Sequence, residues 1–163
     1  MLTTAQLATL KADILADPAL NAQPNNSDGN SAIAAAYNLT AAPTFVVWRS
    51  SVQQETITQN GFDWVRVDNL SVGKARIWEW LFANPMRSIN PSKANVRAGI
   101  NECWKGTADD LAVRAAIYVH CKRGATRGEK LFATGAGTDA DPGLMGFEGS
   151  LSYQDIEQAR ALP

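Results

Sequence analysis

The stretch that decides the fold is Leu111–Val119, which reads Leu-Ala-Val-Arg-Ala-Ala-Ile-Tyr-Val and contains one charged residue, Arg114. On a helix with about 3.6 residues per turn, its apolar side chains point in every direction. A helix that is apolar on all sides is typical of one that is surrounded by other elements. We therefore expect a central apolar helix over residues 107–121, in the core of a helical bundle or of an assembly of chains.

Capping residues and helix breakers predict further helices on both sides of this one. Thr3 or Thr4 opens a helix to about Ala16, which Asp17-Pro18 then breaks. The expected fold is mainly α, a single domain over residues 1–163 with about five to seven helices around the central one. The other expected helices cover residues 31–38, 71–83, 93–104, 125–133 and 152–161. Ser71 and Ser152 are the expected caps of two of them, and Thr107 with Asp110 gives the central helix a start like a capping box.

Two segments do not read as helices. Thr44–Arg49 is β-branched and aromatic, so it is either a short strand or an extended entry to a helix. We favour the extended entry, because no pairing partner is evident nearby. Residues 134–150 are rich in glycine, and Met145 and Phe147 alternate with glycines. This pattern predicts an extended arm or a small hairpin that lies against another chain.

The composition favours a protein that works by contact. Charged residues make up 19% of the 163 residues, below the roughly 25% of ordinary domains. The net charge of −1 argues against a protein that coats nucleic acid. Residues 84–130 hold nine bases and four acids, whereas residues 131–163 hold five acids and one arginine. This asymmetry suits subunits that meet head to tail, and it is also typical of solvated faces.

The sequence offers few signs of a covalent framework, a leader or a membrane span. Cys103 and Cys121 are the two cysteines and have no zinc-like spacing, which indicates a reducing compartment. The first residues lack a basic start followed by an apolar run, so we expect no signal peptide. No stretch approaches the roughly 18 apolar residues of a membrane span.

Three short motifs suggest chemistry that their context does not support. His120 and Cys121 are adjacent, so on a helix their side chains point about 100° apart and do not form a nucleophilic pair. Asp109-Asp110 suits the first turn of a helix, where negative charge is favoured. The loop 135–138 lacks the Gly-Lys-Ser/Thr of a phosphate-binding loop. We therefore expect no catalytic, cofactor-binding or metal-binding residue and no enzymatic activity.

Contact residues are easier to nominate. Trp78 and Trp80 point about 200° apart on a helix, so one of them faces away from any single core and is an interface candidate. Met145 and Phe147 are interface candidates in the glycine-rich segment. The bases Lys122, Arg123, Arg127 and Lys130 form a candidate contact for phosphate or an acidic partner, or a solvated face. Among them, Arg123, Arg127 and Lys130 share one helical face if the helix continues through Gly124.

Three segments together resemble small proteins of tailed bacteriophages and prophages that are associated with virion structural genes. They are Leu70-Ser-Val-Gly-Lys-Ala-Arg-Ile-Trp-Glu-Trp, Asn90-Pro-Ser-Lys-Ala-Asn-Val-Arg-Ala-Gly-Ile, and Lys130-Leu-Phe-Ala-Thr-Gly-Ala-Gly-Thr followed by Phe147-Glu-Gly-Ser-Leu. The resemblance spans most of residues 1–160. It brings no catalytic or binding residues, and it implies a phage origin and a place in the head, neck or tail.

The residues and the resemblance together lead to two hypotheses of different kinds. The first is a virion structural protein at the head–tail junction, which is assembled in the host cytoplasm. It would form a homo-oligomeric ring, contact other virion proteins and packaged DNA, and have no membrane association. The second is a phage-encoded regulator or host-takeover factor that binds DNA or a host protein through the basic residues near 122–130.

Overall fold

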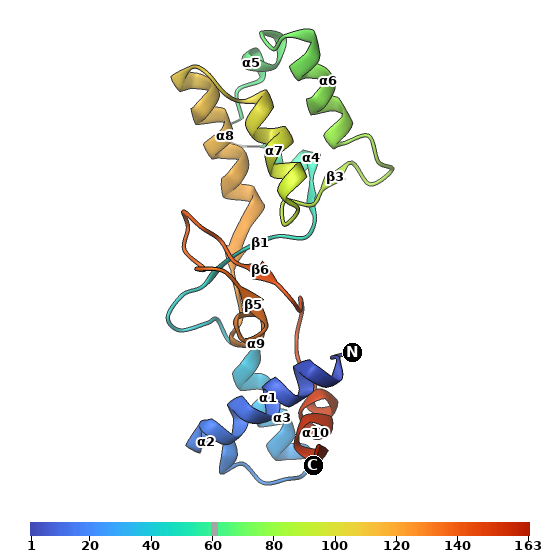
Figure 1. The fold of residues 1–163 in the computed structure, drawn as a ribbon, viewed down its shortest axis with the longest axis vertical. Coiled ribbons are helices and arrows are strands. Elements are labelled where there is room, and N and C mark those ends of the chain that lie inside the picture. Colours follow the sequence, from blue (N-terminus) through green and yellow to red (C-terminus); the bar gives the residue numbers. More distant parts are fainter. Residues whose placement is uncertain (60–61) are drawn as a thin grey trace. The chain divides into compact units, whose positions relative to one another are not determined.

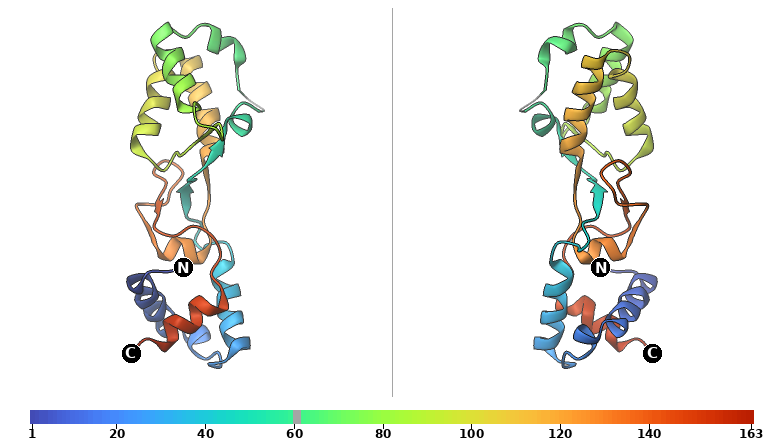
Figure 2. Two further views of the ribbon diagram at one scale, coloured as in Figure 1. Left: turned by 90° about the vertical axis from the view of Figure 1, so that its right-hand side faces the viewer. Right: turned by 90° about the vertical axis from the view of Figure 1, so that its left-hand side faces the viewer.

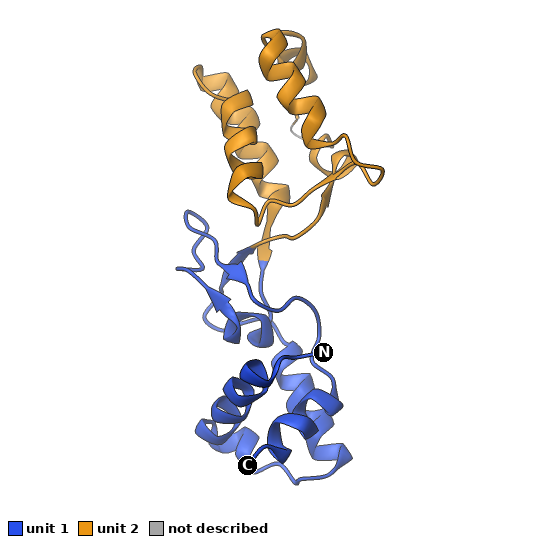
Figure 3. Ribbon diagram, turned by 45° about the vertical axis from the view of Figure 1, so that its right-hand side comes forward, with its two compact units in different colours: residues 1–47, 124–163 blue, residues 48–123 orange. Residues whose placement is uncertain are grey.

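The computed structural model describes residues 1–59 and 62–163. About 53% of the chain is helical, with ten helices and six short strands in the described part. The chain divides into two compact units (Figure 3). Unit 1 comprises residues 1–47 and 124–163, and unit 2 comprises residues 48–123. The broadly helical fold is confirmed, although small β-pairings make it mixed rather than a pure bundle. The single domain stays a prediction.

Unit 1 is built on three packed helices, α1 (Thr4–Ala16), α3 (Ser27–Asn38) and α10 (Tyr153–Ala161), with the short α2 (Pro18–Asn21) after α1 (Figures 1 and 2). Capping boxes at both chain ends start α1 and α10, as the sequence predicts. Apart from Tyr37, the core between these helices is aliphatic, and it consists of Leu2, Leu10, Ile14, Leu20, Ile33, Ala34, Tyr37, Leu151, Ile156 and Ala159.

The glycine-rich segment forms a small hairpin on unit 1. After α9 (Arg127–Leu131), strand β5 (Ala133–Thr134) pairs antiparallel with β6 (Leu144–Met145), with Ala133 opposite Met145. The hairpin packs closely on Phe45, because a Cβ atom at Gly137 would lie 2.1 Å from the Phe45 ring. Of the two predicted forms, the small hairpin is the one that the structure contains.

The prediction for Thr44–Arg49 was wrong, because part of this segment forms strand β1 (Val46–Trp48). We expected an extended entry to a helix, but the Val46 N–H donates to the Gly137 carbonyl at 2.7 Å, and the Gly143 N–H donates to the Val46 carbonyl at 2.8 Å. These partners lie far along the chain, so no pattern near residue 46 reveals them. The chain passes between the units along β1 and along β4 (Lys122–Gly124).

Unit 2 has an aromatic core. Trp78 stacks on Phe62 at 5.8 Å between ring centroids and meets Trp104 edge-on at 5.5 Å. The elements of unit 2 are β2 (Val52–Gln53), α4 (Gln54–Ile57), α5 (Trp64–Asp68), α6 (Val72–Leu81), β3 (Ser88–Ile89), α7 (Ala94–Cys103) and α8 (Ala108–Cys121). The helices α6 and α7 pack against each other, and Ser71 caps α6 as predicted. Strands β2 and β3 pair antiparallel, with Val52 opposite Ile89.

The predicted bundle around one central helix is wrong. The described residues form two hydrophobic clusters, and α8 contributes to only one of them, through Val113, Ile117 and Cys121. These three residues are spaced by four and lie along one side of the helix. Tyr118 packs against the same cluster, whereas Leu111 and Val119 are exposed. The described core therefore covers α8 on one side and does not surround it.

Candidate functional site

The most unusual surface of unit 2 is the outer face of α8. Thr107 and Asp110 start this helix with the predicted capping box, in which the Asp110 N–H donates to Thr107 Oγ1 at 3.1 Å. Leu111 and Val119 are 43% and 72% exposed, although both are large and apolar. The exposed apolar residues from the first turn to the last form the α8 stripe, which consists of Ala108, Leu111, Ala112, Ala115 and Val119.

The α8 stripe has the shape of a contact surface. Its residues recur at three- and four-residue intervals, so they follow one line along the helix. No polar side chain interrupts this line. Arg114 is half-buried and lies about 100° around the axis from Ala115. A solvent-facing helix side normally carries polar residues. The stripe is therefore a surface suited to packing against another helix.

The two tryptophans of α6 lie as their spacing predicts. Trp78 is 5% exposed and belongs to the aromatic core, whereas Trp80 is 72% exposed. Trp78 is thus an interior residue in this chain. Trp80 remains the interface candidate of the pair, and its partner stays a prediction.

Met145 and Phe147 are both half-buried within unit 1. The Phe147 ring meets Phe132 edge-on at 5.8 Å, and the Gly146 N–H donates to the Phe132 carbonyl at 3.1 Å. The described contacts of this segment are with its own unit. Contact with a neighbouring subunit through Met145 or Phe147 stays a prediction.

The structure does not place the four basic residues on one helix. Helix α8 ends at Cys121, Lys122 and Arg123 lie in β4, and only Arg127 and Lys130 lie on the short α9. A shared helical face for Arg123, Arg127 and Lys130 required the helix to continue through Gly124, and this condition is not met. The physical reason is that residues 122–124 adopt extended backbone.

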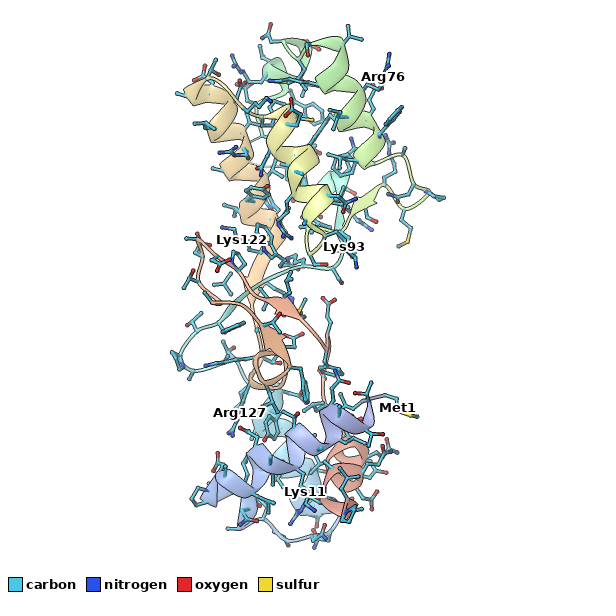
Figure 4. The ribbon with its side chains drawn as sticks, viewed as in Figure 1. Met1, Lys11, Arg76, Lys93, Lys122 and Arg127 are labelled. Atoms are coloured by element: carbon cyan, nitrogen blue, oxygen red, sulfur yellow. The ribbon has the colours of Figure 1, made fainter. Side chains whose placement is uncertain are left out.

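Arg127 has a structural role that the sequence did not reveal (Figure 4). Its guanidinium lies 3.1 Å from an Asp13 carboxylate oxygen and 3.0 Å from one of Asp17, and it covers the Tyr37 ring at 4.8 Å. Hydrogen bonds from the Leu20 N–H and from Arg127 lower the pKa of Asp17. The two acids lie more than a hundred residues earlier in the chain, so spacing gave no signal of this pairing. The Arg127 charge is thus paired with carboxylates of unit 1, while Lys130 donates to the Pro43 carbonyl at 3.3 Å.

The two cysteine thiols are buried, and the carboxylates of Asp109 and Asp110 form ion pairs. Burial raises the pKa of Cys103 to about 11 and that of Cys121 to about 12, so both thiols stay protonated near neutral pH. Arg66 lies 2.9 Å from Asp110 and 3.6 Å from Asp109, and its hydrogen bond lowers the pKa of Asp110. Across residues 1–59 and 62–163, no group of three or more His, Cys, Asp or Glu side chains is placed to hold a metal ion.

Two open hollows add to the contact surfaces. One of about 690 Å³ in unit 1 is bordered by the Arg127 network and by Leu39 and Leu131. Another of about 670 Å³ in unit 2 lies beside Trp64 and Met86, which are 58% and 69% exposed. Exposed rings and thioethers are typical anchors at protein interfaces.

Comparison of the chain with protein-family models, with curated proteins and with solved structures finds no match. Among the described helices, none combines the length and apolar character needed to cross a bilayer. The exposed apolar surfaces of unit 2 are therefore the features from which a function is inferred.

Proposed function

We propose that this chain is a bacteriophage virion structural protein, a head–tail connector or neck component that acts by protein–protein contact. It assembles in the host cytoplasm with copies of itself and with other virion proteins. The observation that carries the proposal is the α8 stripe, a helix face that is exposed and apolar from Ala108 to Val119. The resemblance of residues 70–80, 90–100, 130–138 and 147–151 to phage proteins supplies the setting.

The energetics of the surface support assembly. Burying a Leu or Val side chain contributes about 1.5–3 kcal/mol, so leaving Leu111 and Val119 in water forgoes a substantial gain. A stable interface buries roughly 800 Å² on each partner, which is more than one short helix face supplies. Trp80, Trp64 and Met86 provide further exposed apolar area on unit 2. A protein with several such surfaces is suited to contacting more than one neighbour, as a connector does.

The test is to find the chain in particles. Tailed particles purified from a host that carries the gene should contain the chain at a fixed ratio to the capsid protein by quantitative mass spectrometry. Deleting the gene should yield filled heads and free tails in electron micrographs. Complete particles that lack the chain would overturn the proposal. A chain found instead on DNA or a host protein early in infection would point to the regulatory function.

A further inference from the structure

Three residues of the α8 stripe have a size pattern that reads nearly the same in both directions. Leu111, Ala115 and Val119 follow each other at four-residue steps, with the small residue in the middle and a large one at each end. Leu111 and Val119 are each four residues from Ala115, so a two-fold axis at Ala115 places Leu111 of one copy opposite Val119 of the other. Such self-complementarity is what a symmetric contact between identical surfaces requires.

We infer that two copies of this chain pair through α8 in antiparallel orientation, with the two-fold axis at Ala115. This inference rests on the proposed function, since it names a second copy as the partner of the same surface. Ala115 of each copy meets Ala115 of the other, so the helix axes approach to about 8 Å. Leu111 of one copy then lies opposite Val119 of the other and fills the space on either side of the alanines.

The charges at the two ends of α8 favour the antiparallel orientation. Asp109 in the first turn is 75% exposed, although Arg66 of the same chain lies 3.6 Å from it, while His120 lies in the last turn. Antiparallel pairing brings the acidic start of one helix beside the basic end of the other, and it opposes the two helix dipoles. Parallel pairing would place Asp109 beside its own copy, and like charges in contact are unfavourable.

A disulfide trap tests this geometry. The variant Ala115→Cys places a thiol on the axis, so mild oxidation should give a covalent dimer rapidly. The matched control is Ala112→Cys, which is exposed on the same stripe but is displaced from the axis. Its two copies would lie about 9 Å apart along the helices, which prevents a disulfide. The native thiols of Cys103 and Cys121 are buried and should not compete.

A second measurement tests the pairing without cysteine variants, in case these variants fail to fold. Because α8 alone supplies less than the roughly 800 Å² of a standard interface, the unmodified chain should show a weak dimer at high concentration in sedimentation velocity. The double variant Leu111→Lys/Val119→Lys should weaken this dimer at least tenfold. Val65→Lys/Val72→Lys is the control, because Val65 and Val72 are 69% and 77% exposed on α5 and α6 and their replacement adds the same two charges away from α8. Circular dichroism should show that all three proteins retain their helix content.

The outcomes separate the pairing from the proposed function. Cross-linking of Ala115→Cys no faster than that of Ala112→Cys, or a chain that stays monomeric, would overturn the pairing even if particles contain the chain. A monomeric chain whose Leu111→Lys/Val119→Lys variant is lost from particles would show that another virion protein covers α8. Dimers trapped at Ala115 in a chain that is absent from particles would overturn the virion function and leave the pairing intact.

Discussion

Unit 1 and unit 2 bury side chains of different kinds. The unit 1 core is mainly aliphatic, and this unit contains both polar residues that are buried in the described part of the chain, Asn30 and Glu129, each 2% exposed. The unit 2 core is dominated by the rings of Phe62, Trp78 and Trp104. Trp104 is fully buried, and its indole N–H has no hydrogen-bond partner among the described residues.

The difference follows from how each unit is assembled from the chain. Unit 1 joins two segments that are far apart in sequence, and directional hydrogen bonds link them. The Asn38 side chain accepts from the Leu151 N–H at 2.8 Å and donates to the Leu151 carbonyl at 2.9 Å, while the Arg160 guanidinium donates to the Asn30 side-chain oxygen at 2.9 Å. Unit 2 is one continuous stretch, so non-directional packing of large rings is sufficient to close it.

Because the two units differ in composition, different spectroscopic and chemical probes can follow the unfolding of each unit. All five tryptophans and both cysteines lie within residues 48–123, so tryptophan fluorescence and thiol labelling report on unit 2. Circular dichroism reports on the helices of both units. Comparing these signals shows which unit a substitution affects.

The largest expected effect comes from removing a ring of unit 2. Trp78→Ala should destabilise this unit by about 3–5 kcal/mol, because it leaves a large cavity beside Phe62 and Trp104. In urea titrations, the fluorescence transition should move to lower urea and Cys103 and Cys121 should become reactive. Part of the helical dichroism should persist.

Trp104→Phe is the comparison variant and should lower the free energy of unfolding by roughly 1 kcal/mol. The effect is smaller because the substitution removes the unpaired N–H as well as ring volume. Equal shifts of both signals with Trp78→Ala would show that the units unfold together.

In unit 1, the largest loss of stability is expected from a side chain added at Gly137, which lies against the Phe45 ring. Gly137 has a φ of +68°, and a Cβ there would lie 2.1 Å from the Phe45 ring, so Gly137→Ala should cost roughly 2–4 kcal/mol. The urea midpoint measured by circular dichroism should fall. Gly124→Ala is the matched control, because a Cβ at that position has no neighbour within 4 Å. A similar loss in both variants would contradict the role of the Phe45 contact.

Loss of the Arg127 charge should have a smaller effect. Arg127→Met removes two ion pairs whose side chains are about one-third exposed, so the expected loss is on the order of 1 kcal/mol in urea unfolding. Lys105→Met is the comparison, because the Lys105–Glu102 pair is half-exposed and should contribute less than about 0.5 kcal/mol. No difference between the two variants would show that the Arg127 network is dispensable.

Acid should weaken unit 1 in a defined direction. The pKa of Asp17 in the folded chain lies below its ordinary value of 3.8. The stability that its carboxylate contributes is therefore present above about this pH and is lost as the pH falls toward the folded pKa. Urea midpoints measured by circular dichroism between neutral pH and strong acid should fall less steeply for Asp17→Asn than for the unmodified chain. An unchanged slope would show that Asp17 does not carry this dependence.

Features set by neighbouring residues could be predicted from the sequence. The capping residues Thr3, Ser71, Thr107 and Ser152 start their helices as expected, because an N-cap acts on the backbone within three residues. The opposed directions of the α6 tryptophans also follow from helix geometry alone. The strand at residue 46 and the Arg127 network could not be predicted, since their partners come from distant segments.

The sequence by itself determined that α8 is a helix with apolar residues on every side and that one tryptophan of α6 faces outward. Only the tertiary structure decided which sides are covered: Val113, Ile117 and Cys121 pack in unit 2, while the α8 stripe and Trp80 remain exposed. The physical reason is that helix periodicity depends on local backbone geometry. Burial depends on which distant side chains occupy the space beside each face.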